Sequence, residues 1–369
     1  MRVSPNPGRF AKLRKMQITI DNGHVRCEKD AQALPAACRL HDLPNTAERV
    51  LRRCTRSGFI LGALAASTLP AHAQPRARIR IGVVPAETSA QAFYAKEMGF
   101  FAKAGLDVDI HVFSSASLIT SAVESNSIDV GWSSLVKIIT AHARQIPFVA
   151  IAPASLYLSA APNGAIFVAA NSHIRSAKDL NNTVFAVTEL GTISEYGSRA
   201  WIDRNGGSSA SVLFAGMEDS TMFDALDYGF VDAAYFTEPS LGIAKKRGRF
   251  LAYPYGSFAK DFLFGTWFTM SQWAKDYPDL VAKFSTAIRE AGLWANANRS
   301  KSAEILAKVT KVDPAIVDSM VRARYADRMT PAMMQPEIDV VSKYGDFPPF
   351  AAQDMLYQLD RSPRTSGRH

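Results

Sequence analysis

The sequence predicts an α/β protein of two lobes, each a doubly wound, mainly parallel sheet, with a ligand cleft between the lobes. The first observation is an internal repeat, since Ala122–Trp132 and Ala225–Tyr235 share one pattern of apolar, acidic and aromatic positions at a constant offset of 103 residues (122 to 225). The second is that strand-like and helix-like segments alternate around both motifs, as in parallel sheets covered by helices. The third is length, because the chain of 369 residues, even without a predicted leader of residues 1–73, is longer than chains that typically fold around a single hydrophobic core.

Each repeat is predicted to run β-α-β-α-β. Short apolar runs supply the first strands, the strictly alternating run Leu106–Val112 supplies a second strand, and the shared motifs supply a second helix and a third strand. Gly105 and Asn205-Gly206-Gly207 end the first helix of each repeat. The expected bounds are Ile79–Val84, Ser89–Ala104, Leu106–Val112 and Ile128–Trp132 in the first repeat, and Asn182–Val187, Thr192–Arg204, Ser211–Ala215 and Val231–Tyr235 in the second.

One aspartate recurs in equivalent turns, as Asp129 and Asp232. A pair of catalytic acids is one interpretation of this recurrence. Identical placement before two equivalent strands favours a structural role instead, in which the carboxylate ends the turn and opens the strand. We therefore predict no catalytic function for either residue.

The segment after the second repeat is predicted to return to the first lobe. The chain is expected to cross back over Phe262–Met270, and Pro278 begins a helix whose apolar residues Leu280, Phe284 and Ile288 recur at helical spacing. Further helices complete that lobe, and the polar tail is expected to be disordered. The predicted boundaries are 76–172 and 263–359 for the first lobe, 173–262 for the second and 360–369 for the tail.

The leader contains a predicted secretory signal. Arg52, Arg53 and Arg56 precede the apolar run Gly58–Leu69, and Ala71-His72-Ala73 has the small-x-small form of a cleavage site. The run is too short to span a bilayer, and its flanking residues argue against the alternative of a buried core helix. We predict cleavage after Ala73, so that the mature protein begins at Gln74 in the periplasm.

Residues 1–48 lie upstream of this signal, where signal peptides normally have no such extension, and a start codon assigned too far upstream explains them best. Twin-arginine export is the weaker alternative to the general secretory route, because Cys54-Thr55-Arg56 follow the arginine pair where an apolar residue is expected. The residue after the cleavage site is Gln rather than Cys, so we expect no lipid anchor.

The formal charge of +8 would by itself suggest a nucleic-acid or anionic-lipid partner, but the excess charge is concentrated in the leader. Residues 1–73 hold 12 of the 42 basic and 5 of the 34 acidic side chains. The rest of the chain therefore has 30 basic and 29 acidic side chains and is nearly neutral. All three cysteines, Cys27, Cys38 and Cys54, also precede the predicted cut. We therefore expect no nucleic-acid partner, and a mature protein without a disulfide or a cysteine-metal site.

A ligand site is predicted at the carboxyl ends of the strands, where ligands bind in open α/β sheets. Five loops at this edge are rich in Ser, Thr and Gly, and the helix N-termini after them offer free N–H donors. The loops are Pro85–Ser89, Ser114–Ser117, Trp132–Ser134, Thr188–Ser194 and Phe236–Pro239. An N-cap role explains each Ser or Thr equally well on its own, but a composition shared by five loops favours a pocket. The candidate apolar walls beside the loops are Trp132, Tyr196, Tyr235, Phe236 and Trp267. The candidate ligand-binding residues are Glu87, Thr88, Ser114, Ser115, Trp132, Ser133, Ser134, Thr188, Glu189, Gly191, Thr192, Ser194, Thr237 and Glu238.

Five motifs follow one another in a fixed order: Ile81–Pro85, Lys96–Asp109, Ser127–Gly131, Asp179–Val184 and Ala225–Ala234. Together they resemble the motifs of the solute-binding proteins of ABC importers. The nitrate/sulfonate/taurine branch, which includes carriers of thiamine-pyrimidine precursors, is the most similar, and the resemblance covers nearly all of the chain after the leader. It implies a type II periplasmic binding protein, a monomer, that closes two lobes around a small-molecule ligand and delivers it to an inner-membrane ABC permease with its ATPase.

The five loops depart from a site for a bare anion, because they contain no Lys, Arg or His and do contain Glu87, Glu189 and Glu238. A small inorganic anion would have only helix ends and hydroxyl groups to hold it. An organic solute that is sulfonate-like, aromatic or pyrimidine-like is therefore expected, with an apolar body near Trp132 or Trp267 and an amine or ring nitrogen facing Glu87 or Glu189.

Motifs of common enzyme classes are missing from the sequence, including Gly-x-Ser-x-Gly, His-Glu-x-x-His and the glycine-rich phosphate loops. The histidines after the leader, His111, His142, His173 and His369, form no pattern typical of metal ligands. We predict a binding protein that is not an enzyme and has no catalytic residue, metal or cofactor. A pyrimidine-synthase-like enzyme of the same fold and a ligand-sensing periplasmic domain without transport remain the alternatives.

Overall fold

The computed structural model of the protein describes residues 18–21, 24–27 and 77–358. Residues 77–358 all belong to one compact unit. The predicted cleavage site and the predicted disordered tail lie outside the described residues.

The first sheet has five strands in the order β4-β3-β5-β14-β6. Its first three strands run parallel, and β14 pairs antiparallel with both of its neighbours. The sheet is therefore mainly parallel, as predicted, with a single reversed strand. The strands are β3 (Ala77–Val83), β4 (Leu106–Val112), β5 (Val130–Ser134), β6 (Phe148–Pro153) and β14 (Gly265–Met270).

The second sheet repeats this order as β10-β9-β11-β8-β12, with β8 as its reversed strand. These strands are β8 (Gly164–Ala169), β9 (Val184–Val187), β10 (Leu213–Gly216), β11 (Ala233–Thr237) and β12 (Gly248–Ala252). Two further short strands, β1 (Ile18–Asp21) and β2 (His24–Cys27), follow β10 at its edge, where Gly216 is in register with His24.

The sequence repeat corresponds to a structural repeat at the same offset. Helix α4 (Ala116–Glu124) and helix α7 (Asp219–Asp227) are displaced by 103 residues (116 to 219), as are β5 and β11 (130 to 233). The Asp129 carboxylate accepts the N–H of Arg80 at 2.7 Å, and the Asp232 carboxylate accepts the N–H of Val184 at 3.0 Å. Each aspartate thus fastens its turn to the first strand of its own repeat, at Arg80 within β3 and at Val184 at the start of β9, which is a structural role.

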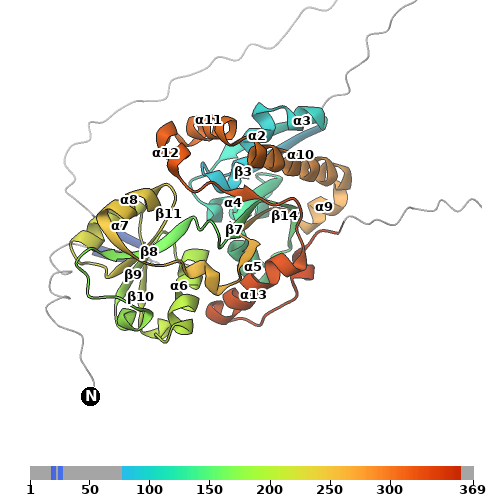
Figure 1. Ribbon diagram of the computed structural model, residues 1–369. Coiled ribbons are helices and arrows are strands. Elements are labelled where there is room, and N and C mark those ends of the chain that lie inside the picture. Colours follow the sequence, from blue (N-terminus) through green and yellow to red (C-terminus); the bar gives the residue numbers. More distant parts are fainter. Residues whose placement is uncertain (1–17, 22–23, 28–76, 359–369) are drawn as a thin grey trace, which may run out of the picture. The chain divides into compact units, whose positions relative to one another are not determined.

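Helices cover both faces of the first sheet (Figure 1). One core packs the sheet against α2, α3, α10 and α11, with Tyr94, Phe284 and Ile288 fully buried. On the other face α5 packs against α13. Gly99, at φ +76°, divides the single helix predicted for 89–104 into two, because this left-handed conformation interrupts helical hydrogen bonding. The helices are α2 (Gln91–Glu97), α3 (Phe100–Lys103), α5 (Leu135–Ala143), α9 (Ser271–Asp276), α10 (Pro278–Ala297), α11 (Arg299–Thr310), α12 (Pro314–Ser319) and α13 (Pro331–Gly345).

The second sheet is covered by α6 (Ile193–Arg204), α7 and α8 (Ser240–Arg247). Its own core contains the stacked rings of Phe223 and Phe236, whose centroids lie 4.4 Å apart. The described residues also form five short 3-10 helices: η1 (Glu87–Ser89), η2 (Ala177–Leu180), η3 (Ser209–Ser211), η4 (Pro254–Ser257) and η5 (Ala352–Met355).

Two strands cross between the lobes and pair with each other. β7 (Ser155–Leu158) and β13 (Asp261–Leu263) form a small antiparallel sheet with β15 (Arg324–Tyr325). The chain therefore crosses before β8, whereas the boundary expected at residue 172 assigned β8 to the first lobe. The repeat could not reveal this, because β8 and β14 lie outside both β-α-β-α-β units. Paired crossing strands of this kind are typical of a hinge.

Within the described ranges, no helix combines the length and the apolar character needed to cross a membrane.

Candidate functional site

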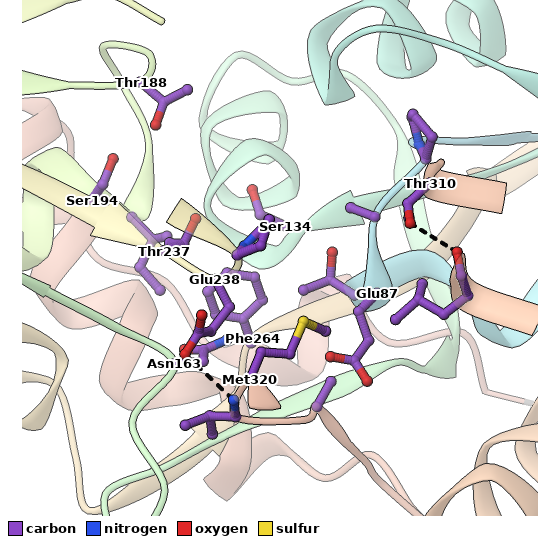
Figure 2. A pocket seen from close by; sticks show the side chains of 18 of the residues that line it. Glu87, Ser134, Asn163, Thr188, Ser194, Thr237, Glu238, Phe264, Thr310 and Met320 are labelled. Atoms are coloured by element: carbon purple, nitrogen blue, oxygen red, sulfur yellow. Dashed lines mark hydrogen bonds between the residues drawn. The ribbon is translucent and has the colours of Figure 1, made fainter. Parts of the chain in front are cut away.

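A pocket of about 400 Å³ lies where loops of both sheets meet. The loops after β3, β9 and β11 and the carboxyl-terminal half of β5 contribute to it, together with the residues just before β8 and β14 and the segment from α11 to α12. Figure 2 shows Thr188 and Ser194 on one side of the pocket and Glu87 and Thr310 on the other. Both lobes therefore supply its lining at the carboxyl ends of their strands, where sheets of this topology bind ligands.

Ten of the fourteen candidate residues line this one pocket: Glu87, Thr88, Trp132, Ser134, Thr188, Glu189, Thr192, Ser194, Thr237 and Glu238. The other four do not line it. Ser133 is fully buried and points to the opposite face of β5 from Trp132 and Ser134. Ser115 caps α4 by accepting the N–H of Leu118 at 3.4 Å, next to the exposed Ser114. Gly191, at φ +66°, shapes the turn before α6 with its backbone.

Among the five candidate aromatic walls, only Trp132 lines the pocket. Trp267 is fully buried in the first lobe, where its Nε1 donates to Gln91 Oε1 at 3.0 Å and its ring packs on Phe284. Tyr235 and Phe236 are also fully buried. The expectation of a solute beside Trp267 is therefore wrong, because that ring belongs to the core.

Sequence reasoning missed the residues that close the pocket from the first lobe. Leu306, Thr310, Val317 and Met320 come from α11, α12 and the turn after it. Their helical pattern predicted helices, but it did not show which face would meet the cleft. Asn163, Tyr255 and Phe264 were also missed, and each lies near a chain crossing rather than in a repeated loop.

Glu87 is held in a buried ion pair. Its carboxylate accepts a hydrogen bond from Arg322 Nε, and the two side chains are only 10% and 8% exposed. Burial raises the pKa of the Glu87 carboxyl, and the guanidinium of Arg322 opposes that shift. We expected the Glu87 carboxylate to be free to bind an amine of the solute. It is instead paired with Arg322.

Glu189 has partners across the cleft. Its Oε1 accepts hydrogen bonds from Lys137 Nζ at 2.9 Å and from Ser117 Oγ at 2.8 Å. Ser117 and Lys137 lie on α4 and α5 of the first lobe, whereas Glu189 follows β9 of the second. Glu189 therefore connects the two lobes through a partly buried ion pair, in which the side chains are 17% and 33% exposed.

Glu238 is the remaining carboxylate of the lining. Its Oε1 accepts the N–H of Val321 at 3.3 Å, a second contact between the lobes. Among the described residues, no cationic group lies within ion-pair distance of it, and burial raises the pKa of its carboxyl. Glu238 is thus the carboxylate of the pocket that has no ion-pair partner in the described part of the chain.

The N-terminus of α6 supplies polar groups at the same place. Thr192, Ile193 and Ser194 line the pocket, and Thr192 Oγ1 lies 2.8 Å from Ser194 Oγ. A helix N-terminus favours partial negative charge on a bound group, and Glu195 in the first turn reduces that preference. This end of the pocket suits a hydrogen-bond acceptor rather than a full negative charge.

Apolar side chains form much of the remaining wall, including Trp132, Phe264, Met320 and Val317. No Lys, Arg, His or Cys is among the described residues that line the pocket. Nor does the described part of the chain contain a cluster of His, Cys, Asp or Glu that could hold a metal ion. The lining therefore fits a small organic molecule with an apolar body and a few polar groups.

Comparison with known proteins identifies a matching family and a distant relative. The NMT1/THI5-like family matches residues 87–302. A Brucella abortus protein provisionally named a binding protein is 26% identical over 280 residues, which cover 72% of this chain and 82% of that protein.

Solved structures show the same fold. The periplasmic aliphatic sulphonate-binding protein SsuA of Escherichia coli aligns with a TM-score of 0.64 and 17% identity, over 79% of this chain and 94% of its own. The periplasmic nitrate-binding protein NrtA of Synechocystis aligns with a TM-score of 0.61 and 16% identity, over 75% and 84%. The desulfurization enzyme DszB aligns with a TM-score of 0.58 and 14% identity, over 77% and 97%. With a family match over more than half of its length, the chain belongs to the NMT1/THI5-like family and has the two-lobed α/β fold of the periplasmic binding proteins.

Proposed function

We propose that the protein is the solute-binding component of an ABC-type importer, which captures a small organic solute between its lobes and delivers it to a membrane permease. The observation that carries this proposal is the pocket of about 400 Å³, because both lobes line it and the paired crossing strands provide a hinge. The names of the structural neighbours, which include periplasmic binding proteins for sulphonate and nitrate, support the same role.

Two contacts between the lobes support capture by closure. Lys137 and Ser117 bind Glu189 on one side of the cleft, and the N–H of Val321 binds Glu238 on another. Each contact depends on the distance between the lobes, so each is lost when the cleft opens. A solute that fills the pocket would favour the closed arrangement in which both contacts form.

The charges of the lining define the class of solute. Glu87 and Glu189 form ion pairs with Arg322 and Lys137, whereas Glu238 forms no ion pair with a described residue and has only the more distant charge of Lys245 near it. A small inorganic anion would meet this carboxylate without meeting any cationic residue of the lining. The pocket is better suited to a neutral or cationic organic solute, whose apolar body packs near Trp132 and whose N–H group faces Glu238.

An enzyme of the same fold is the second candidate, because DszB is an enzyme with a similar structure. Covalent or acid–base catalysis commonly uses Lys, His or Cys, and the described lining contains none of them. The described lining therefore favours binding over catalysis. A ligand-sensing domain without transport is distinguished from an importer component by whether purified permease binds the loaded protein.

Native mass spectrometry of the protein from its own periplasm is the direct test. We expect one small organic molecule to remain bound after gentle purification. A thermal-shift panel of nitrate, sulfate, taurine, aromatic sulfonates, carboxylates and aminopyrimidines then identifies the class, since a solute at one hundred times its Kd stabilises the fold by about 2.7 kcal/mol. If the protein carries no solute and every member of the panel leaves the melting temperature unchanged, the proposed binding role is wrong.

A further inference from the structure

A second cavity, of about 290 Å³, lies behind the wall of the solute pocket. Arg322, Ala323 and Arg324 line it, whereas Met320, Val321 and Ala323 of the same segment line the solute pocket. The two cavities are therefore separated by a single extended segment. The last turn of α10 borders the second cavity through Ala295 and Asn296, and α11 begins there at Arg299.

Three arginines line this second cavity: Arg299, Arg322 and Arg324. No Asp or Glu is among its described lining residues. The guanidinium groups of Arg322 and Arg299 already have acceptors, since Arg322 pairs with Glu87 and Arg299 donates to the carbonyls of Asp318 and Met320 at 3.2 Å. Arg324 is different, because its exposed guanidinium has no hydrogen-bond or ion-pair partner among the described residues.

The first turn of α11 borders the same cavity through Arg299 and Ser302. This twelve-residue helix has no side-chain cap at Asn298 and no acidic residue in its first turn. Its N-terminal N–H groups and the positive end of its dipole therefore add to the field of the three guanidinium groups. A concave site with this field attracts a negative group, and the planar fork of Arg324 matches two oxygens of one oxyanion.

We propose that this second cavity is a binding site for a small oxyanion of the phosphate class, separate from the solute pocket. Arg324 supplies the bidentate contact, Arg299 supplies a second cation, and Arg322 contributes its field while it stays paired with Glu87. Because Arg322 lies between the two cavities, an anion in the second one weakens the attraction between Arg322 and Glu87 and is sensed at the solute pocket.

Isothermal titration of the mature protein with inorganic phosphate tests this site. We expect saturable binding to one site, and a loss of affinity of about tenfold in Arg324→Ala, since removal of one charged hydrogen-bonded contact costs on the order of 1.4 kcal/mol. Arg324→Lys keeps the charge without the fork and should show an intermediate loss. Arg328→Ala, an exposed arginine outside the cavity, is the matched control and should bind phosphate as the wild type does.

Several outcomes would overturn the assignment. If the wild type does not bind phosphate, the site does not exist. Equal losses in Arg324→Ala and Arg328→Ala would mean an adventitious ion only, attracted by general surface charge. Retention on phosphatidylglycerol vesicles without binding of free phosphate would assign the arginines to a lipid surface and contradict the small-anion site. None of these variants alters a residue of the solute pocket, so failure here leaves the proposed solute-binding role untouched.

Discussion

Lys137 Nζ lies 2.9 Å from Glu189 Oε1, and this ion pair joins helix α5 of the first lobe to the loop after β9 of the second. Ser117 Oγ donates to the same carboxylate oxygen. Sequence reasoning placed Glu189 in the cleft as a group for the solute. The structure gives it two partners from the facing lobe, so its charge contributes to closure.

Replacing Lys137 with Met should weaken the closed state. A partly exposed ion pair contributes about 0.5–1 kcal/mol, so we expect solute affinity to fall about two- to fivefold. Titration calorimetry measures the affinity, and small-angle scattering measures the decrease in radius on solute binding. Arg78→Met is the matched control, since Arg78 pairs with Asp109 at 2.9 Å within one sheet. Similar losses in both variants would show that Lys137 does not act across the cleft.

Glu238→Gln should reduce affinity for an N–H-bearing or cationic solute while leaving the fold intact. The variant keeps an acceptor for the N–H of Val321 but removes a charge that forms no ion pair with a described residue. Charge-assisted hydrogen bonds contribute about 1.5–3 kcal/mol, which predicts a loss of roughly tenfold or more. A thermal-shift titration with the best organic compound of the panel checks this. Tight nitrate binding, or unchanged affinity in the variant, would contradict the assigned charge of the pocket.

Arg322→Met should destabilise the first lobe strongly. It leaves Glu87 buried without its cation, and breaking one side of a buried pair costs about 3–5 kcal/mol. Urea denaturation measures the free energy of unfolding. The double variant Glu87→Gln/Arg322→Met should recover much of the loss, because it removes both charges. If the double variant is as unstable as the single one, the loss comes from packing of the Arg322 side chain instead.

Glu337 should make stability depend on pH. It is fully buried in α13, and burial raises the pKa of its carboxyl well above the usual range, against a weaker opposing contact with the backbone N–H of Val136. The folded state then holds a proton that the unfolded state releases above pH of about 4.3. Stability from this group is therefore complete below that pH and falls by up to about 1.4 kcal/mol per unit as pH rises towards the folded pKa.

Glu337→Gln should remove this component, so the variant gains stability relative to the wild type as pH increases. Thermal or urea unfolding from about pH 3 to about pH 8 measures the difference, because this range begins about one unit below 4.3 and ends several units above it. Glu304→Gln, at an exposed position, is the control with an unchanged profile. Parallel pH profiles for wild type and Glu337→Gln would show that this carboxyl does not titrate differently in the folded state.

Export should remove the leader. Expressed in a Gram-negative host, the protein is expected in the periplasm with Gln74 as its first residue, because Ala71-His72-Ala73 has the form of a cleavage site. N-terminal sequencing of the periplasmic fraction measures the cleavage position. A control with Ala71→Arg and Ala73→Arg should accumulate uncleaved. Recovery of residues 1–48 on the exported wild type would contradict both the signal and the misplaced start codon.

The repeated elements were predictable because their information is local. The turn and strand around Asp129 and Asp232 are encoded within short motifs, and both aspartates have the structural role that was predicted, through contacts with the backbone of a neighbouring strand. The reversed strands β8 and β14 were harder, since each inserts between partners that lie far away in the chain. A strand pattern predicts the strand, but it does not specify the sheet that the strand joins.

Some residues of the candidate site were likewise predictable from the sequence, and others were not. Hydroxyl-rich loops at strand ends predicted much of the pocket lining, because parallel strands place their carboxyl ends at one edge. The partner of Glu87 could not be predicted, since Arg322 lies 235 residues further along the chain. Trp267 was misassigned for a similar reason: its burial depends on Gln91 and Phe284, which only the folded core brings to it.

The reversed strand β14 also affects the order in which the two lobes can be completed. Strands β8 to β12 occupy residues 164–252 without interruption, so that part of the second sheet can form from one continuous stretch of chain. In the first sheet β6 has β14 as its neighbour, and β14 ends at Met270. Domains generally fold in chain order, but here the lobe that begins first must wait for a strand that follows the other lobe. Until Met270 is available to fold, β5 and β6 lack the strand that pairs with both of them.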